Sequence, residues 1–280
     1  MKRILPLLII TLLLLTISEA QNNKPVDRNN SMKPLSELLN NQKKGWDVIT
    51  QWSSNARNKI EILSKDNLRA DSALYQSQLE ASSPLGAVVY GCGGILIEDG
   101  WIRILGSGCT RLDRSLPDWN KGKSTFKSKD QSNFLLVGDD VIGGIYGMKT
   151  EGPDNTTIGK IYYFGPNSLQ WEATGLSYIG FINFCFSGNL QSFYGDFQWH
   201  NWQEEVKRIN GNEVISCYPL LWTKEGKEMK SNRKIVSIQK QWELYHPQLK
   251  SETNNVLAKK SPVRKSTEHS KSTIQKSKGK

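Results

Sequence analysis

The chain has 280 residues and a formal net charge of +10, with 37 Lys or Arg against 27 Asp or Glu. The nine Lys or Arg and two Glu of residues 246–280 account for +7 of this charge and residues 1–20 for +1, so residues 21–245 carry only +2. This nearly neutral body argues against a nucleic-acid-binding domain, which would carry its positive charge on the folded surface.

The first 20 residues have the pattern of a cleavable signal peptide. Lys2 and Arg3 precede the apolar run of residues 4–17, and small residues lead to a predicted cleavage site at Ala20/Gln21. The alternative is an uncleaved membrane anchor, but this run spans only about 21 Å as a helix, against about 30 Å for the hydrocarbon core. The sequence therefore predicts a secreted or periplasmic protein whose mature chain has no transmembrane segment.

Helices are predicted after a flexible polar leader at residues 21–32. Apolar residues recur every three or four positions across residues 33–63, where Gly45 divides a short helix from a longer one. A second periodic stretch covers residues 66–79, and Pro84 is expected to lie beyond its end.

Strands are predicted from residue 87 onward, because short apolar and β-branched runs alternate with glycines. The runs are residues 87–90, 94–97, 101–105, 134–137, 141–148 and 160–164. The pair Asp99-Gly100 is a strong two-residue hairpin signal between two of them. Residues 110–132 read as a long polar loop.

The last part of the domain is predicted to return to helices. These are residues 177–186 and 199–209, and residues 235–245 form a final element of either type. Helices first, antiparallel strands next and helices again predict one α+β domain over residues 33–245, with an antiparallel-rich central sheet.

Four cysteines remain after export, and an oxidising compartment permits disulfides between them. Folding the chain at Asp99-Gly100 would bring Cys92 near Cys109, so we predict this pair and, by default, the pair Cys185–Cys217. The alternative is four free thiols. No C-x-x-C occurs, so neither a zinc knuckle nor a thioredoxin-type site is indicated.

Patterns that carry catalysis or bind metals are poorly represented. His200 is the one histidine ahead of residue 246, and Ser107 lacks the G-x-S-x-G turn of a hydrolase nucleophile. The zinc, calcium and nucleotide-binding motifs are absent from the sequence. A glycosidase would need two carboxylates across a sugar cleft, and the sequence singles out no such pair. We therefore expect no metal site and no cofactor.

A contact surface for a partner is proposed on the polar loop and on an acidic turn. Trp119 is an aromatic residue in a polar loop, which makes it either a binding anchor or a lid that packs on the core. The adjacent Asp139 and Asp140 are interpreted as a turn between strands, the alternative being hard oxygen ligands. The hypothetical surface comprises Leu116, Pro117, Asp118, Trp119, Asp139 and Asp140.

Residues 246–280 form a basic tail with almost no large apolar side chains. Such a segment buries too little surface to offset the entropy of ordering, so it is predicted to be disordered. We interpret it as a solvated extension. The alternative is a polycationic arm that contacts an anionic polymer or a membrane surface.

Several uncommon sequence words occur in the order typical of one family. They lie at residues 82–108, 114–120, 135–148, 161–178, 181–194 and 213–222. In these words the chain resembles the family called domain of unknown function 2625, over about residues 35–245. It is more loosely similar to the SUKH superfamily, in which an acidic-Gly turn like residues 140–144 precedes a strand and a helix.

The SUKH superfamily is an α+β fold used largely as protein-binding modules, many of them immunity proteins against polymorphic toxins. The resemblance therefore implies binding rather than catalysis, and it brings no catalytic residues. We expect an exported, non-enzymatic module that binds an unidentified protein and no specific nucleic acid. The alternative is an envelope-associated carbohydrate-binding protein or hydrolase, whose cationic tail contacts the wall or membrane.

Overall fold

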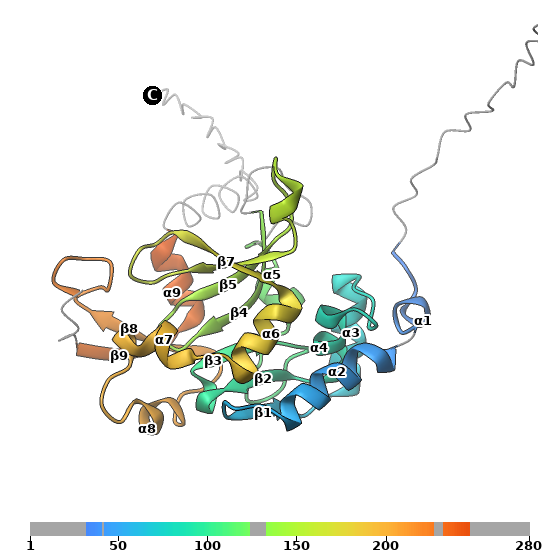
Figure 1. Ribbon diagram of the computed structural model, residues 1–280, viewed down its shortest axis with the longest axis horizontal. Coiled ribbons are helices and arrows are strands. Elements are labelled where there is room, and N and C mark those ends of the chain that lie inside the picture. The colour runs from blue at the N-terminus through green and yellow to red at the C-terminus, as the bar shows by residue number, and fades with distance from the viewer. Residues whose placement is uncertain (1–31, 41, 124–132, 227–231, 247–280) are drawn as a thin grey trace, which may run out of the picture. The chain divides into compact units, whose positions relative to one another are not determined.

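A seven-stranded antiparallel sheet forms the centre of the protein, and each strand pairs with the next one along the chain (Figure 1). The computed structural model describes residues 32–40, 42–123, 133–226 and 232–246, so the predicted signal peptide, most of the leader and the tail after His246 lie outside it. The strands are β1 (Ile60–Leu63), β2 (Gly94–Ile97), β3 (Ile102–Leu105), β4 (Phe134–Asp140), β5 (Ile145–Lys149), β6 (Lys160–Phe164) and β7 (Trp171–Ser177). The predicted α+β class is confirmed.

Helices precede, interrupt and follow the sheet. They are α1 (Leu35–Leu38), α2 (Gln42–Ser54), α3 (Asn67–Ser77), α4 (Pro84–Gly91), α5 (Leu116–Asn120), α6 (Tyr178–Ser187), α7 (Leu190–Tyr194), α8 (Trp202–Val206) and α9 (Ile238–Tyr245), with short 3₁₀ turns η1 (Glu98–Gly100), η2 (Asn155–Thr157) and η3 (Gly195–Phe197). The described residues from Lys33 onward form one compact unit. Within the described part of the chain, no helix combines the length and apolar character needed to cross a bilayer.

The predicted hairpin at Asp99-Gly100 is present between β2 and β3. Its last ladder pair joins Ile97 to Ile102, and the chain turns through η1. Glu98, Asp99 and Gly100 have φ values of 48°, 60° and 101°, so three consecutive residues have the positive φ that tight turns require.

Two neighbouring residues of β6 show that the sheet is covered on both faces. Successive strand residues point to opposite sides of a sheet. The ring of Tyr163 lies 5.2 Å from that of Phe193 in α7, whereas the ring of Phe164 lies 5.6 Å from that of Tyr245 in α9. Helices α7 and α9 therefore pack against opposite faces.

A two-stranded ribbon of β8 (Glu213–Tyr218) and β9 (Asn232–Ser237) forms a second sheet. The amide of Ile215 in β8 donates to the carbonyl oxygen of Val141 at 2.6 Å, directly after β4. This bond attaches β8 to the main sheet, and it leaves β9 on the outer side of the ribbon.

Two predicted elements in the first half of the domain were wrong. Residues 60–63 were predicted as the end of a helix but form the edge strand β1, in which Ile60 pairs with Ile97 of β2. Residues 87–90 were predicted as a strand but lie inside α4. The Ser83 side chain accepts a hydrogen bond from the amide of Gly86, and Pro84 occupies the first turn, where proline starts a helix rather than stopping one.

The C-terminal part also differs from the prediction. The helix predicted over residues 199–209 is confined to α8, and strands β7 and β8 were not predicted. Residues 235–245 divide at Ser237, whose side chain accepts a hydrogen bond from the amide of Lys240 and caps α9. The ambiguous periodicity therefore has a simple cause, because a strand and a helix meet inside the segment.

Candidate functional site

The contact surface predicted from the sequence does not form a surface. Leu116, Trp119, Asp139 and Asp140 are buried, Pro117 is half-buried, and of the six residues only Asp118 is exposed. A side chain that is enclosed by its own protein cannot meet a partner without local unfolding. The prediction that these six residues form one binding surface is therefore corrected.

Trp119 is a lid packed on the core, which was the second of its two interpretations. It lies in α5, where Ser115 and Asp118 form a capping box that fixes the first turn. The ring is only 4% exposed and packs edge-on against Trp242 of α9, with 6.2 Å between the ring centroids. The guanidinium of Arg114 lies 4.7 Å from the same ring.

Asp139 is the centre of a buried ion cluster. Its Oδ1 accepts a hydrogen bond from Arg103 Nε at 2.6 Å, and its Oδ2 forms an ion pair with Arg114 Nη1 at 2.5 Å. The carboxylate is 0% exposed, and both arginines are buried as well. Buried charges occur in proteins when they are paired in this way.

The two arginines also attach the β8 segment to the main sheet. Arg103 donates from Nη1 to the carbonyl oxygen of Glu213 at 2.5 Å and from Nη2 to that of Asp140 at 2.7 Å. Arg114 donates from Nη2 to the carbonyl oxygen of Gly211 at 2.9 Å. The cluster therefore satisfies three backbone carbonyl groups, although Arg114 Nε has no hydrogen-bond partner among the described residues. Bonds of this kind are the chemistry of a structural core.

Asp140 faces a different set of partners. Its Oδ1 accepts hydrogen bonds from the amides of Ile142 and Gly144, and its Oδ2 from the hydroxyls of Tyr163 at 2.7 Å and Tyr194 at 3.0 Å. Burial raises the pKa of Asp140 to about 6, although these hydrogen bonds act in the opposite direction. Tyr194 also shares a short hydrogen bond with Tyr146.

These acidic residues lie where no substrate reaches them in this structure. A Cβ on Gly144 would stand 2.2 Å from the Tyr163 hydroxyl and 2.3 Å from Asp140 Oδ2, so the turn leaves no free space beside the carboxylate. The interpretation of Asp139 and Asp140 as a turn is corrected in part, because both residues close strand β4 and the turn follows them. Their side chains organise the core.

Neither disulfide predicted from the sequence is present. Cys92, Cys109 and Cys185 are free thiols, so neither predicted pair is bonded. The hairpin does bring Cys109 beside Gly93, but the Cys92 thiol points back into its own helix and donates to the carbonyl oxygen of Val88 at 3.4 Å. Burial raises the pKa of Cys92 to about 12, so this thiol is held in its unreactive protonated form.

The nucleophile and base considered from the sequence are not brought together. Ser107 is buried and its hydroxyl donates to the carbonyl oxygen of Cys92 at 2.9 Å, whereas His200 is exposed. Among the residues that the structure describes, no cluster of three His, Cys, Asp or Glu has the geometry to hold a metal ion.

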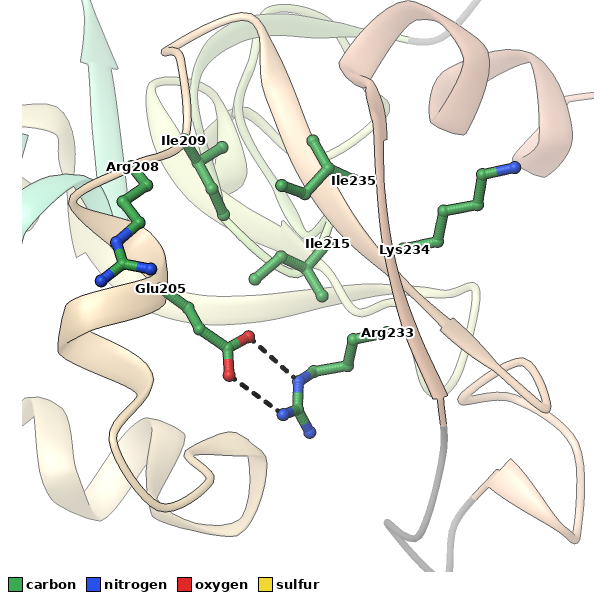
Figure 2. A pocket seen from close by; sticks show the side chains of 7 residues that line it. All are labelled: Glu205, Arg208, Ile209, Ile215, Arg233, Lys234 and Ile235. Atoms are coloured by element: carbon green, nitrogen blue, oxygen red, sulfur yellow. Dashed lines mark hydrogen bonds and ion pairs between the residues drawn. The ribbon is translucent and has the colours of Figure 1, made fainter.

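A surface hollow lies between α8 and the β8–β9 ribbon, and we call it the α8–β9 groove (Figure 2). It has a volume of about 260 Å³. Its lining residues are Glu205, Arg208, Ile209, Ile215, Arg233, Lys234 and Ile235. No residue of the groove was singled out by the sequence.

The floor of the groove is aliphatic. Ile215 and Ile235 are directly paired across the ribbon, so both point to the same face, and Ile209 approaches them from the α8 side (Figure 2). Ile235 is 51% exposed although its neighbour Ile215 is buried. The groove therefore offers water an apolar surface with its cations at the rim.

One of those cations is already held. Arg233 donates to both carboxylate oxygens of Glu205, from Nη2 at 3.1 Å and from Nε at 3.3 Å, and its guanidinium lies 4.5 Å from the Trp199 ring. The Trp199 indole N–H donates to Glu205 Oε1 at 3.0 Å. Arg208 and Lys234 are exposed. Arg208 lies near Glu204, a carboxyl whose pKa is lowered by Lys207 and also by Arg208.

A second hollow of about 270 Å³ lies beside α2 and α4 and includes Trp46, Asp47, Lys65 and Tyr90. The ammonium group of Lys65 in this hollow already forms a cation–π contact, because its Nζ lies 3.6 Å from the centre of the Tyr90 ring. The α8–β9 groove is the stronger candidate, since it combines an apolar floor with the exposed cations Arg208 and Lys234.

Comparison with known proteins places the chain among relatives of unknown role. A family model described as protein of unknown function DUF2625 matches residues 35–241. An uncharacterised protein of Haemophilus influenzae is 42% identical over 188 residues, which cover 67% of this chain and 82% of that relative. The uncharacterised protein YbfG of Escherichia coli K12 is 35% identical over 215 residues, which cover 77% of this chain and 96% of that relative.

The resemblance carried by the quoted sequence words is thereby confirmed, whereas the looser similarity to the SUKH superfamily stays a prediction. The chain belongs to the DUF2625 family.

Proposed function

We propose that this protein is an exported, non-enzymatic module that binds another protein, and that the α8–β9 groove is its contact site. The observation that carries the proposal is Ile235, an aliphatic side chain that is 51% exposed in the isoleucine floor and lies beside the exposed cations Arg208 and Lys234. Exposed apolar surface with a polar rim is the usual composition of a protein interface.

The buried acidic residues support a binding role rather than catalysis. Asp139 and Asp140 are fully enclosed, and their partners are core side chains and backbone groups. The groove, in contrast, presents isoleucines, arginines and lysine, which are poor general acids or bases at neutral pH, and its carboxylate, Glu205, is engaged by Trp199 and Arg233. Contact with a partner is what these groups do well.

Export rests on the N-terminal pattern of Lys2, Arg3 and the apolar run that follows. We expect the mature protein to begin at Gln21. Intact-mass measurement of the full-length gene product from a periplasmic fraction checks this, with the same product from the cytoplasmic fraction as control. A mass that retains residues 1–20 in every fraction would contradict cleavage.

Binding is tested by capture from the envelope fraction with three tagged baits: the mature protein, Ile235→Asp and the matched control Ile158→Asp. Ile158 is also exposed, at 41%, but lies outside the groove. We expect one stoichiometric protein with the mature protein and with Ile158→Asp, and its loss with Ile235→Asp, because a charge placed on the apolar floor must be desolvated on contact.

The captured protein is then purified and titrated against each bait by calorimetry, after urea unfolding has confirmed that both variants are folded. Because Ile235 is an exposed edge-strand residue, its substitution should change stability little. Equal affinity of Ile235→Asp and Ile158→Asp for the purified partner would contradict the groove as the contact site.

A further inference from the structure

We infer that the groove receives an extended acidic segment of the partner, which adds to β9 as a third strand of the ribbon and places an aliphatic side chain on the isoleucine floor. This inference rests on the proposed function and names the chemistry of the partner.

The groove reaches around the outer edge of β9. Arg233 and Ile235 are two residues apart and share the face that looks toward α8, whereas Lys234 between them points to the other face. Figure 2 shows Lys234 directed away from the isoleucines. All three side chains line the groove, and only a ligand that runs along the strand edge contacts both faces at once.

The backbone of β9 is suited to accept a strand. Its ladder with β8 has no break: it begins at the pair formed by Glu213 and Ser237 and ends at the pair formed by Tyr218 and Asn232. In an antiparallel pair, alternate residues direct their N–H and C=O groups away from the partner strand. Within the described residues, the outer edge of β9 forms no backbone hydrogen bonds. An extended peptide can take up these groups.

The β7 edge of the main sheet is less suitable than β9. Strand β7 contains Gly175 with a φ of 76°, and its register with β6 shifts between Lys160 and Tyr162. Such irregularities are a common way to prevent strand addition. Strand β9 has no such interruption, so addition is expected at β9 rather than at β7.

The side chains of the groove define what the added strand carries. Ile209, Ile215 and Ile235 favour an aliphatic side chain on the α8 face. Lys234 on the opposite face favours a carboxylate at the position next to the aliphatic residue. Arg208 at the α8 rim favours a second carboxylate two positions from the aliphatic residue, on the same face as that residue. Arg233 contributes less, because Glu205 already neutralises it.

Charge excludes the nearest alternative occupants. The tail at residues 246–280 has a net charge of +7 and would be repelled by Arg208 and Lys234. A second copy paired edge to edge through β9 would bring the Arg233-Lys234 pairs of both copies together, and like charges on adjacent strands destabilise a sheet. An acidic segment from a different protein meets neither objection.

The experiment measures binding by fluorescence anisotropy with a labelled peptide, Thr-Asp-Asp-Glu-Ile-Asp-Val-Thr, and with a matched peptide in which lysine replaces each acidic residue. Its third residue shares the face of the isoleucine and can meet Arg208, whereas its second, fourth and sixth residues share the face that meets Lys234. The acidic peptide should bind the mature protein, and binding should weaken as salt is raised. Arg208→Glu and Lys234→Glu should each weaken it by about fivefold or more, whereas Lys44→Glu, an exposed cation of α2, should not.

Strand addition predicts an alternating response to backbone N-methylation. Only every second amide of an added strand faces β9. Methylation of one alternate set should therefore abolish binding, and methylation of the other set should leave it within about twofold. Equal sensitivity of both sets would overturn strand addition.

The outcomes separate this inference from the proposed function. If the captured partner depends on Ile235 but the acidic peptide neither binds nor competes with it, the binding function stands and the acidic-strand inference is overturned. If Ile235→Asp affects neither the captured partner nor the peptide, both proposals are overturned. Equal binding of the lysine peptide would also overturn the acidic specificity.

Discussion

Asp139→Ala will lower the free energy of unfolding by about 3–5 kcal/mol, because it leaves two buried guanidinium groups without their shared carboxylate. Arg103 and Arg114 both contact Asp139, and neither can turn to water without breaking its bonds to backbone carbonyls. Urea unfolding followed by tryptophan fluorescence measures the loss. Because the cluster joins β3, β4 and β8, the loss should appear as a shift of one cooperative transition.

The matched control is Asp113→Ala, which removes the partner of Arg69. That ion pair has the same chemistry and a distance of 2.6 Å, but Asp113 is 62% exposed. Solvent weakens such pairs, so the control should lose less than about 1 kcal/mol. Equal losses for the two variants would mean that the Asp139 cluster is better solvated than its burial implies.

A second variant separates charge burial from packing. Replacing all three charged residues together, with Arg103→Met, Arg114→Met and Asp139→Leu, removes the unpaired charges that Asp139→Ala creates. Buried ion clusters replaced by apolar residues of similar volume often keep or gain stability. The triple variant should therefore be more stable than Asp139→Ala, even though it changes three residues instead of one.

Local signals predicted the elements whose geometry is local. Asp99-Gly100 indicated the β2–β3 hairpin correctly, because positive φ angles at a turn depend on the turn residues themselves. Pro84 misled the prediction, since proline stops one helix and starts another, and the capping role of Ser83 decides between the two. Strand β1 was missed because its four residues continue the apolar spacing of the preceding helix.

The candidate site depends on long-range contacts that no local pattern encodes. Asp139 lies 36 residues from Arg103, and nothing near Asp139 in the sequence marks it as buried. A polar residue in an acidic pair is usually a turn residue, and burial overrode that preference. The α8–β9 groove likewise combines residues 205–209 with 215 and 233–235, and only the ladder pair Ile215–Ile235 assembles its floor.

The basic edge of β9 has two physical interpretations. Charged residues, lysine above all, are a common device that keeps edge strands from pairing, so Arg233-Lys234 can protect β9 against association with itself. The same charges admit a strand of opposite sign. Protection against self-pairing and selection of an acidic partner are therefore one property of this edge, and the lysine peptide distinguishes indiscriminate pairing from selective pairing.

The raised pKa of Asp140 predicts a contribution to the free energy of unfolding that depends on pH. Burial raises the pKa of its carboxyl to about 6 in the folded protein, against 3.8 for an ordinary aspartate. Between these two values the folded state binds more protons at this site than the unfolded state does. The contribution of Asp140 to the free energy of unfolding therefore increases as the pH falls from about 7 to about 4.

The size of this effect follows from the shift. Each pKa unit corresponds to about 1.4 kcal/mol, so the full change across the window is at most about 3 kcal/mol. Total stability is a poor measure of it, because other carboxyls act in the opposite direction. The pKa of Glu204 is lowered by Lys207, for example, and this pair loses stability as the pH falls.

The measurement is therefore a difference between the native protein and Asp140→Asn, each unfolded in urea at pH 7, 6, 5 and 4. Asparagine is neutral throughout and keeps an oxygen that can accept from the amides of Ile142 and Gly144. The free energy of unfolding of the native protein should increase relative to that of the variant as the pH falls. A constant difference would mean that the carboxyl titrates at its ordinary pKa.

The variant Tyr163→Phe tests independently which form of the Asp140 carboxyl the Tyr163 hydroxyl stabilises. The Tyr163 hydroxyl donates to Asp140 Oδ2 and stabilises the ionised carboxylate, so its removal should raise the pKa of Asp140 further. The comparison with Asp140→Asn is then repeated with Tyr163→Phe present in both proteins. The pH at which the free energy of unfolding begins to rise relative to that of Asp140→Asn should move upward. A downward movement would mean that the hydroxyl favours the protonated carboxyl, and the hydrogen bond would then run from Asp140 to the phenol.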